Sequence, residues 1–582
     1  IFVALLFAVG GPYFILAATG PVVQRWLTYF EHETLPYRLY SVSNVASLIA
    51  LISFPFIVAP YLSSSGQQKT WSLLYGIYAV LMLSLLYSFW QKRNNGSLLV
   101  TLSESNDNRA NHSRLPLTHI VLWLTLSSLG VILLVATTSA MTQNVPPVPF
   151  LWILPLSLYL LTFIISFHST HWYVRWYWVS FFILCALLGV LMHFIGSQLD
   201  IVSQVVIYAS ILFSGCMICH GELTRLKPQA NHLTSFYLMM SLGGFLGSAL
   251  VAFVAPLVFA YFVEYPLSLI AVLVLVAFCN RLELNSSLTK QAWLSEVSMG
   301  IAIILAIGFI LLNQQYVKND VFSARNFYGA LSVKDVQIAN NTERRLVDGT
   351  TSHGTQYLDP TKAYIPLSYY RAKTGVAIAF DVLNDKKINA GLIGLGAGAL
   401  AAYGREQDSL HFYELNSAVK SAAQTYFSYL KDSKANITFT IGDGRVSLQR
   451  ELDNQQQNTF NLLVVDAFAG DSIPQHLLTL EALALYLKHM SRNGIIAFHI
   501  SNTHLNLQPL ILGLAKSQNL QAVYFKTNGV NEGEHDTEWM WLTNNGQALS
   551  HPLVKQYGLK MLANGTEVTW TDDFSPLLSV LK

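Results

Sequence analysis

Long runs of apolar residues fill the first 312 positions of this 582-residue chain, and they constrain its fold more than any other feature. A helix that crosses a bilayer needs about 20 mostly apolar residues. Such runs predict about ten spans, near residues 1–19, 40–61, 71–90, 116–141, 148–167, 176–196, 201–219, 234–257, 262–280 and 296–313. The chain begins at Ile1, inside an apolar run, so we expect further residues upstream.

The charged residues are distributed unevenly along the chain. They make up only 12% of it, whereas soluble proteins average roughly 25%. The deficit lies in residues 1–312, and the remainder has an ordinary globular composition. The net charge of +2 gives no electrostatic reason to expect nucleic acid as a partner. We predict a polytopic transmembrane domain at 1–313, a β-rich lead-in at 314–384 and an α/β domain at 385–582.

Polar residues border several of the predicted spans. Cys216 to His220 match the pattern for c-type haem attachment, but no other feature supports haem, so we expect two small helical residues followed by a loop histidine. His220, Glu222, Arg225 and Lys227 should lie near a helix end, where long side chains reach water. The small residues of 241–247 indicate a closely packed helix face.

The second half of the chain alternates between two patterns. Residues 327–380 suggest short strands and turns, with a further strand at 375–383. Apolar strands are then expected at 388–395, 411–415, 437–441, 460–465 and 494–500, and helices at 399–404, 418–430 and 476–490. Strands that alternate with helices predict a parallel, doubly wound, Rossmann-like sheet.

Glycines and acids follow these strands at the positions where such sheets bind ligands, beyond the carboxyl ends. Gly394, Gly396 and Gly398 follow the first strand, and glycine lets the backbone approach a nucleotide closely. Glu414 ends the second strand, 20 residues after Gly394, a spacing that suits ribose hydroxyls. Asp443-Gly444 and Asp466 follow the third and fourth strands. Together these motifs predict a nucleoside site.

The stretches GLIGLGAGALAAYG, FYELN, IGDGRVSL and LLVVDAFAGDSIPQHLLTLEAL resemble the fused membrane and spermidine-synthase-like proteins. PYFILAATGPVVQRW, PYRLYSVSNVASLIAL and CHGELTRLKP resemble the membrane half of that family, so the resemblance covers the whole chain. It implies a membrane-bound transferase that aminopropylates an amine acceptor and releases methylthioadenosine. The co-substrate would be S-adenosylmethionine or its decarboxylated form, with no metal.

The resemblance also implies roles for individual residues. Gly394, Gly396 and Gly398 would line the cofactor, Glu414 would bind the ribose, and Asp443 and Gly444 would contact the adenine. Asp466 would accept a proton from the attacking amine. Asp471 is either a second catalytic acid or a helix cap. His353 and Gln356, in a polar loop before the sheet, are weaker candidates for substrate contact.

Two departures from the family pattern leave the reaction open. Ala397 stands where soluble spermidine synthases carry the aspartate that helps hold the aminopropyl amine. Residues 499–502, His-Ile-Ser-Asn, replace their Gln-Gly-Glu stretch. The alternatives are a transporter or sensor with a nucleoside-binding domain, and a methyltransferase or lyase that acts on S-adenosylmethionine. The lipid bilayer is an expected partner, and a homodimer is also compatible with the sequence.

Two arguments disagree about the orientation in the membrane. The loops near 91–115, 168–175, 220–231 and 281–295 carry most basic residues of the first half and fall on one side. The positive-inside rule makes that side cytoplasmic, which would put the soluble domain outside. A nucleotide cofactor argues for the cytoplasm. We expect a protein of a bacterial-type inner membrane whose soluble domain faces the cytoplasm.

Overall fold

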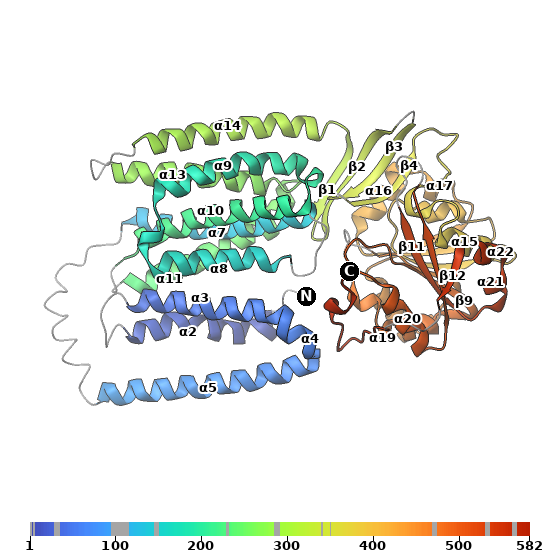
Figure 1. Cartoon of the computed structure of the whole chain (residues 1–582), viewed down its shortest axis with the longest axis horizontal. Coiled ribbons are helices and arrows are strands. Elements are labelled where there is room, and N and C mark those ends of the chain that lie inside the picture. Colours follow the sequence, from blue (N-terminus) through green and yellow to red (C-terminus); the bar gives the residue numbers. More distant parts are fainter. Residues whose placement is uncertain are drawn as a thin grey trace. The chain divides into compact units, whose positions relative to one another are not determined.

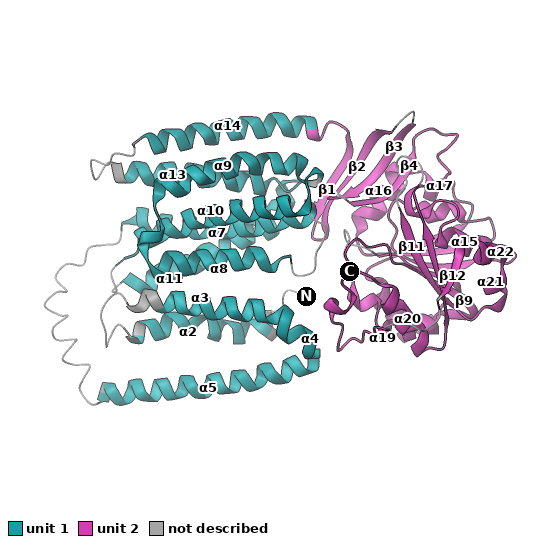
Figure 2. Ribbon diagram, in the orientation of Figure 1, with its two compact units in different colours: residues 1–145, 150–315 teal, residues 146–149, 316–582 magenta. Residues whose placement is uncertain are grey.

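The computed structural model describes residues 3, 6–27, 35–94, 116–144, 151–228, 232–284, 292–338, 341–349, 351–467, 474–529, 536–561 and 567–582. These residues form two units (Figure 2). Unit 1 comprises residues 1–145 and 150–315, and unit 2 comprises residues 146–149 and 316–582.

Unit 1 is a bundle of helices (Figure 1). In the described residues, eight helices are long and apolar enough to cross a membrane. They are α3 (Leu35–Ser53) with its continuation to Tyr61, α5 (Ser64–Asn94), α7 (Leu117–Asn144), α9 (Arg175–Ile195), α10 (Ile201–Arg225), α11 (Leu233–Ala249) with its continuation to Val258, α13 (Glu264–Leu284) and α14 (Ala292–Tyr316). Two shorter helices, α2 (Gly11–Leu27) and α8 (Ile153–His168), complete the bundle. The predicted span at 1–19 lies partly outside the described residues.

The small residues of α11 pack directly against α7. A Cβ atom at Gly243 would lie 2.4 Å from the carbonyl oxygen of Leu124, and one at Gly247 would lie 2.4 Å from that of Ser128. Any larger side chain would therefore push the two helices apart. This contact confirms the close packing expected for residues 241–247.

The polar residues of α10 differ from the sequence expectation. The helix continues to Arg225 and buries both His220 and Glu222, so the expectation that these two reach water is wrong. Glu222 is neutralised by Arg175, whose Nε and Nη2 lie 2.6 and 2.5 Å from its two carboxylate oxygens. The Tyr173 hydroxyl donates to the same carboxylate over 2.6 Å. This pairing allows a charged group to lie inside the bundle.

The Cys216–His220 segment is helical and internal. Cys216 and Cys219 are fully buried, which agrees with small helical residues rather than haem attachment. His220 belongs to the same helix instead of a loop. Its Nδ1 lies 2.9 Å from the Thr162 hydroxyl, and its ring stacks on Phe163 with centroids 3.6 Å apart.

Unit 2 begins with a four-stranded antiparallel sheet. Its strands, in spatial order, are β1 (Asp320–Asn326), β2 (Gly329–Ile338), β3 (Asn341–Asp348) and β4 (Thr351–Tyr357). Its apolar face packs on α16 (Ser417–Tyr426) through a small cluster that includes Val333, Leu346 and Ala422.

The second sheet of unit 2 has eight strands in the order β12-β10-β11-β9-β8-β5-β6-β7. The five predicted strands are confirmed and are parallel: β5 (Asn389–Ile393), β6 (Ser409–Glu414), β7 (Asn436–Ile441), β8 (Phe460–Val465) and β9 (Met490–His499). Three antiparallel strands extend the sheet beyond β9: β10 (Gln521–Thr527), β11 (Thr537–Thr543) and β12 (Gly558–Met561). Two apolar clusters cover the sheet, one on each face.

Helices pack on both faces of this sheet: α15 (Gly375–Val382), α16, α17 (Tyr429–Asp432), α18 (Gly444–Asp453), α19 (Leu480–Lys488), α20 (Gln508–Ser517), α21 (Gly546–Ser550) and α22 (Pro552–Tyr557). The strand predicted at 375–383 is wrong, because these residues form α15. Residues 375–380 are all buried, and a short, fully apolar run has no period that distinguishes helix from strand. The helix predicted at 399–404 is a single 3₁₀ segment, η9 (Ala399–Tyr403).

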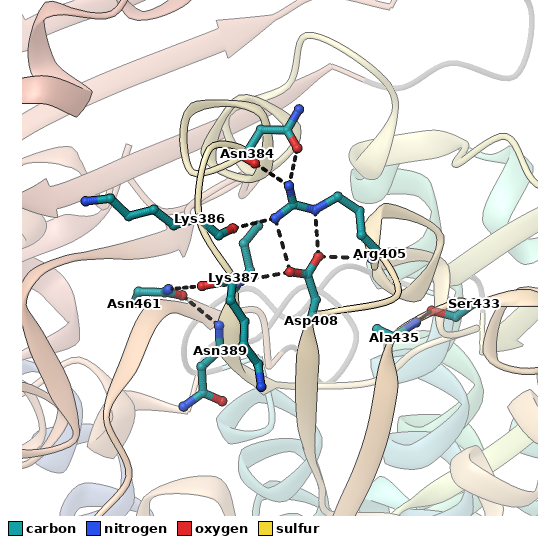
Figure 3. Close-up of polar contacts among 10 residues, drawn as sticks. Asn384, Lys386, Lys387, Asn389, Arg405, Asp408, Ser433, Ala435 and Asn461 are labelled. Carbon is teal, nitrogen blue, oxygen red and sulfur yellow. Dashed lines mark hydrogen bonds and ion pairs between the residues drawn. The ribbon is translucent and has the colours of Figure 1, made fainter.

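A network of polar groups holds the amino ends of the parallel strands (Figure 3). Both carboxylate oxygens of Asp408 accept hydrogen bonds from Arg405, and Oδ1 also accepts from the backbone N–H of Ile388 over 2.8 Å. The Asn461 side chain accepts from the backbone N–H of Asn389 over 2.9 Å and donates to the Lys387 carbonyl over 2.7 Å. These contacts join the entries to β5, β6 and β8, which leaves the opposite ends of the strands for ligands.

Candidate functional site

A cavity of about 590 Å³ opens at the carboxyl ends of the parallel strands. It is lined by residues that directly follow β5, β6, β7, β8 and β9, and by residues of β3 and β4. Seven of the residues predicted from the sequence lie on its wall: His353, Gly394, Gly396, Glu414, Asp443, Gly444 and Asp466. The fold therefore brings together side chains that are more than 110 positions apart in the sequence.

The glycine turn after β5 is shaped by close backbone contacts. Gly394 has a φ of +108°, and a Cβ there would lie 2.0 Å from the carbonyl oxygen of Asp466. Gly396 has a φ of +55°, and a Cβ there would lie 2.2 Å from the carbonyl oxygen of His353. Only glycine fits both positions without strain. Gly398, with a φ of +82°, packs against Leu430 and does not line the cavity.

Glu414 lies buried at the end of β6. Its two carboxylate oxygens accept hydrogen bonds from the backbone N–H groups of Leu395, over 3.1 Å, and Asn416, over 2.8 Å. Burial raises the pKa of this carboxyl, although the backbone donors act in the opposite direction. Glu414 thus fixes the glycine turn and faces the cavity.

Asp443 caps the helix that follows β7. Its Oδ1 accepts from the Val446 N–H over 2.9 Å at the start of α18, and its Oδ2 lies 2.8 Å from Nε2 of His476. The hydrogen bond with His476 is the largest influence that lowers the pKa of Asp443. Gly444 is buried, and a Cβ there would lie 2.7 Å from Ile393. Asp443 and Gly444 both line the cavity beside the glycine turn.

Asp466 follows β8, and both of its hydrogen-bond partners are side chains. Its side chain is only 8% exposed. Nδ1 of His499 lies 2.7 Å from Oδ1, and the Tyr370 hydroxyl donates to Oδ2 over 2.7 Å. Burial alone would raise the pKa of Asp466, but His499, Tyr370 and His353 together outweigh it and lower the pKa. These contacts favour the ionised form of the largely buried Asp466 carboxylate.

The weaker candidates lie in different surroundings. His353, in β4, lines the cavity, and burial lowers its pKa, which favours the neutral imidazole. Gln356 does not line the cavity. Its amide donates to the Ala363 carbonyl over 2.8 Å and accepts from the Ser428 N–H over 2.9 Å, so it joins β4 to α17. Asp471 lies outside the described residues.

Ala397 is enclosed by protein and does not line the cavity. Its Cβ lies 2.5 Å from the position that a Cβ on Gly354 of β4 would occupy, and it belongs to the apolar cluster between the first sheet and α16. A longer side chain at this position would meet the backbone of β4. The replacement of the family's aspartate by Ala397 thus accompanies a close approach of β4 to the glycine turn.

Several cavity residues were not selected from the sequence. Tyr370 belongs to none of the strand-end motifs, and His499 and Ser501 stand out in the sequence only because they differ from the family pattern. Nε2 of His499 lies 2.8 Å from the Ser501 hydroxyl. Asp348, at the end of β3, also lines the cavity, and burial raises its pKa to about 6. The signal that could have indicated His499 is its place at the end of the fifth strand.

Comparison with known proteins adds one informative relative. The polyamine aminopropyltransferase of Vibrio vulnificus (strain CMCP6) is 28% identical over 178 residues, which are 29% of this chain and 57% of that protein. Over these 178 residues the chain is similar in sequence to that aminopropyltransferase. This chain spans little more than half the length of that relative. No protein-family model matches this chain.

Solved structures of the same type also align with the chain. A probable spermidine synthase from Corynebacterium glutamicum is 13% identical, with a TM-score of 0.33, and covers 44% of this chain and 97% of its own. The spermidine synthase from Thermotoga maritima is 12% identical, with a TM-score of 0.30, and covers 44% of this chain and 84% of its own.

Proposed function

We propose that this chain is a membrane-anchored transferase that moves an alkylamine group from S-adenosylmethionine, or its decarboxylated form, to an amine acceptor. In this displacement the amine nitrogen bonds to the carbon beside sulfur, the C–S bond breaks, and methylthioadenosine leaves. One observation carries the proposal: the ionised, buried Asp466 faces the same cavity as Glu414, the candidate for the ribose.

The residues around the cavity would divide the work of binding. The glycine turn of Gly394 and Gly396 would lie against the nucleoside, Glu414 would accept hydrogen bonds from the ribose hydroxyls, and Asp443 and Gly444 would contact the adenine. Asp466 would hold the acceptor amine in line with the C–S bond, since a carboxylate attracts the ammonium and can help remove its proton. The apolar helices of unit 1 would anchor the enzyme in a lipid bilayer.

Product analysis with the purified full chain tests the proposal. The chain is incubated with S-adenosylmethionine or decarboxylated S-adenosylmethionine, each with and without putrescine as the amine. Methylthioadenosine that forms only when the amine is present supports alkyl transfer. Methylthioadenosine that forms without the amine indicates a lyase, and S-adenosylhomocysteine indicates a methyltransferase.

A second candidate function follows from Ala397. An alanine that does not line the cavity replaces the family's aspartate, so the chain lacks the family's partner for the donor's amine. This favours a donor other than decarboxylated S-adenosylmethionine or a domain that binds nucleoside without turnover. A sensor or transporter with such a domain would bind methylthioadenosine in calorimetry and convert neither donor.

A further inference from the structure

Asp466 is the end of a continuous chain of hydrogen bonds. Nδ1 of His499 lies 2.7 Å from Asp466 Oδ1, and Nε2 of the same ring lies 2.8 Å from the Ser501 hydroxyl. The backbone N–H of Glu538 donates to that hydroxyl over 2.7 Å. Ser501, like Asp466, lines the cavity. An acid, an imidazole and a hydroxyl thus follow one another along one wall of the site.

The donors in this chain determine where the protons lie. An ionised Asp466 can only accept, so His499 donates to it from Nδ1 and keeps the lone pair of Nε2. With Nε2 as an acceptor, the Ser501 hydroxyl can donate its proton to it over 2.8 Å, a shorter contact than those to Thr537 Oγ1 at 3.4 Å and the Glu538 carbonyl at 3.5 Å. The ring is held in this orientation by stacking on Trp539, with centroids 4.6 Å apart, and by contact with Tyr369.

We propose that His499, reached through Ser501, accepts the proton that the acceptor amine loses, and that Asp466 orients and stabilises the resulting imidazolium. This inference rests on the proposed transfer reaction. The acceptor enters as an ammonium and gives one proton to Ser501 Oγ, while the hydroxyl proton passes to Nε2 of His499. The neutral amine then attacks the carbon beside sulfur, and the electron pair of the broken C–S bond stays on sulfur. The proton leaves His499 for water after the product is released.

Basicity supports this order of events. A general base works best when its pKa lies near the operating pH. The contacts of Asp466 lower the pKa of its carboxyl, which makes it a weak acceptor for an ammonium proton. An imidazole is a stronger base than such a carboxylate. His353 also lies near Asp466, but burial lowers its pKa, which makes it a poor proton acceptor.

The groups that face His499 include both acids and bases. They come from β4, η8 (Ser368–Tyr370), the end of β8, β11 and the segment after β9, and comprise His353, Tyr369, Tyr370, Asp466, Thr537, Glu538 and Ser501. Asp466 lies within ion-pair distance of the His499 ring, with 2.7 Å between Oδ1 and Nδ1.

The test is the pH dependence of kcat in the detergent-solubilised full chain, with decarboxylated S-adenosylmethionine or S-adenosylmethionine as donor and putrescine as amine. The wild type should lose rate on the acid side as one group is protonated. His499→Gln should lower kcat by about 10²–10⁴ and abolish this acidic limb. Ser501→Ala should lower kcat in the same direction. Both variants should bind methylthioadenosine with wild-type affinity, which shows that the site is folded.

His489→Gln is the matched control. His489 is also fully buried and hydrogen-bonded, with Nε2 3.0 Å from the Leu448 carbonyl, but it does not line the cavity. This variant should keep both kcat and the acidic limb. A His499→Gln enzyme that retains the acidic limb would overturn the relay and leave the transferase proposal intact. A wild-type chain that forms no methylthioadenosine with either donor would overturn both.

Discussion

Glu414 has two tasks in this structure, since it holds the glycine turn through the Leu395 N–H and faces the cavity. If it also binds ribose, Glu414→Gln removes a charge-assisted hydrogen bond. We expect the affinity for methylthioadenosine to fall by about 1–3 kcal/mol, measured by calorimetry. The control is Glu343→Gln, because Glu343 is equally buried but pairs with Arg345 outside the cavity. Unchanged affinity in a folded Glu414 variant would remove this residue from the site.

Asp466→Asn should separate binding from turnover. The amide is nearly isosteric with the carboxylate, so the fold and most of the nucleoside affinity should remain. Turnover should fall by about 10²–10⁴, and the loss should appear in kcat rather than only in KM for the nucleoside. Steady-state kinetics with a saturating donor measure this. If the variant keeps nearly the full rate, Asp466 has no role in proton transfer, and Asp471 becomes the next residue to replace.

Ala397 shows how one element limits another. Ala397 is fully buried beside Gly354 of β4, so we expect little room for the family's aspartate at this position. We expect Ala397→Asp to destabilise unit 2, since it buries an unpaired charge, and to give no gain in turnover with decarboxylated S-adenosylmethionine. Hydrogen exchange of β4 amides measures the first effect. The exposed Ala372→Asp should be neutral in both respects, and faster turnover by Ala397→Asp would contradict this account.

Asp408 links stability to pH at the amino ends of the strands. Burial would raise its pKa, but Arg405 and the Ile388 N–H outweigh burial and lower it. A lowered pKa stabilises the fold above the unfolded value of about 3.9, and this contribution is lost as the pH falls through the folded pKa. Asp408→Asn should therefore lower the free energy of opening of β5 and β6 by about 1–3 kcal/mol at pH 7. This difference from the wild type should shrink below about pH 4.

Hydrogen exchange of the β5 and β6 amides in the full chain measures the effect of Asp408→Asn. Asp453→Asn is the control, because Asp453 is exposed and bonded only to the nearby Gln449 side chain among the contacts described. If the exchange protection of the variant differs from that of the wild type by the same amount at pH 7 and at pH 3, the charge of Asp408 does not contribute to stability.

The elements that could be predicted from the sequence are those with a clear period or a strong terminal signal. The five parallel strands could be predicted because each contains an apolar run. A glycine or an acid closes four of these runs, in β5 to β8, and Gly494 opens the run in β9. Helix α15 was missed because its first six residues are all buried and show no amphipathic face. The strands β10 to β12, which pair antiparallel, were not predicted. The internal position of Glu222 depends on Arg175, 47 positions away, which a local pattern does not reveal.

The candidate site, too, could be predicted only where its residues belong to local sequence motifs. Residues that belong to local motifs at strand ends, such as Glu414 and Asp466, were selected and lie on the cavity wall. His499 and Tyr370 contact Asp466 from segments 33 and 96 positions away. Their roles depend on tertiary contacts rather than on neighbouring residues. Gln356 has the polar character expected of a site residue, but its hydrogen bonds are within the fold.

The buried pair of Arg175 and Glu222 ties three helices of unit 1 together, because Arg175 also donates to the Asn280 side chain in α13 over 3.1 Å. Removal of one partner leaves an uncompensated buried charge, which costs about 3–5 kcal/mol in proteins. We expect Glu222→Ala to lower the thermal midpoint of the detergent-solubilised chain strongly. Glu296→Ala, which breaks the exposed pair with Arg281, should change it little. Equal midpoints for the two variants would show that the buried pair adds nothing.

The orientation of the whole chain is tested across α14, the last apolar helix before β1. If α14 crosses the bilayer, residues 285–291 and unit 2 lie on opposite sides. The basic loops argue that unit 2 is outside, whereas a transferase that consumes a nucleotide donor needs the cytoplasm. We expect unit 2 to face the cytoplasm.

One cysteine placed within 285–291 and another at Glu406, an exposed residue of unit 2, are treated with an impermeant maleimide in intact cells. The four native cysteines are buried and should give no background. Labelling of the first site alone agrees with a cytoplasmic enzyme. Labelling of Glu406→Cys alone would place unit 2 outside the cell membrane, away from the cellular donor, and would favour a nucleoside sensor over a transferase.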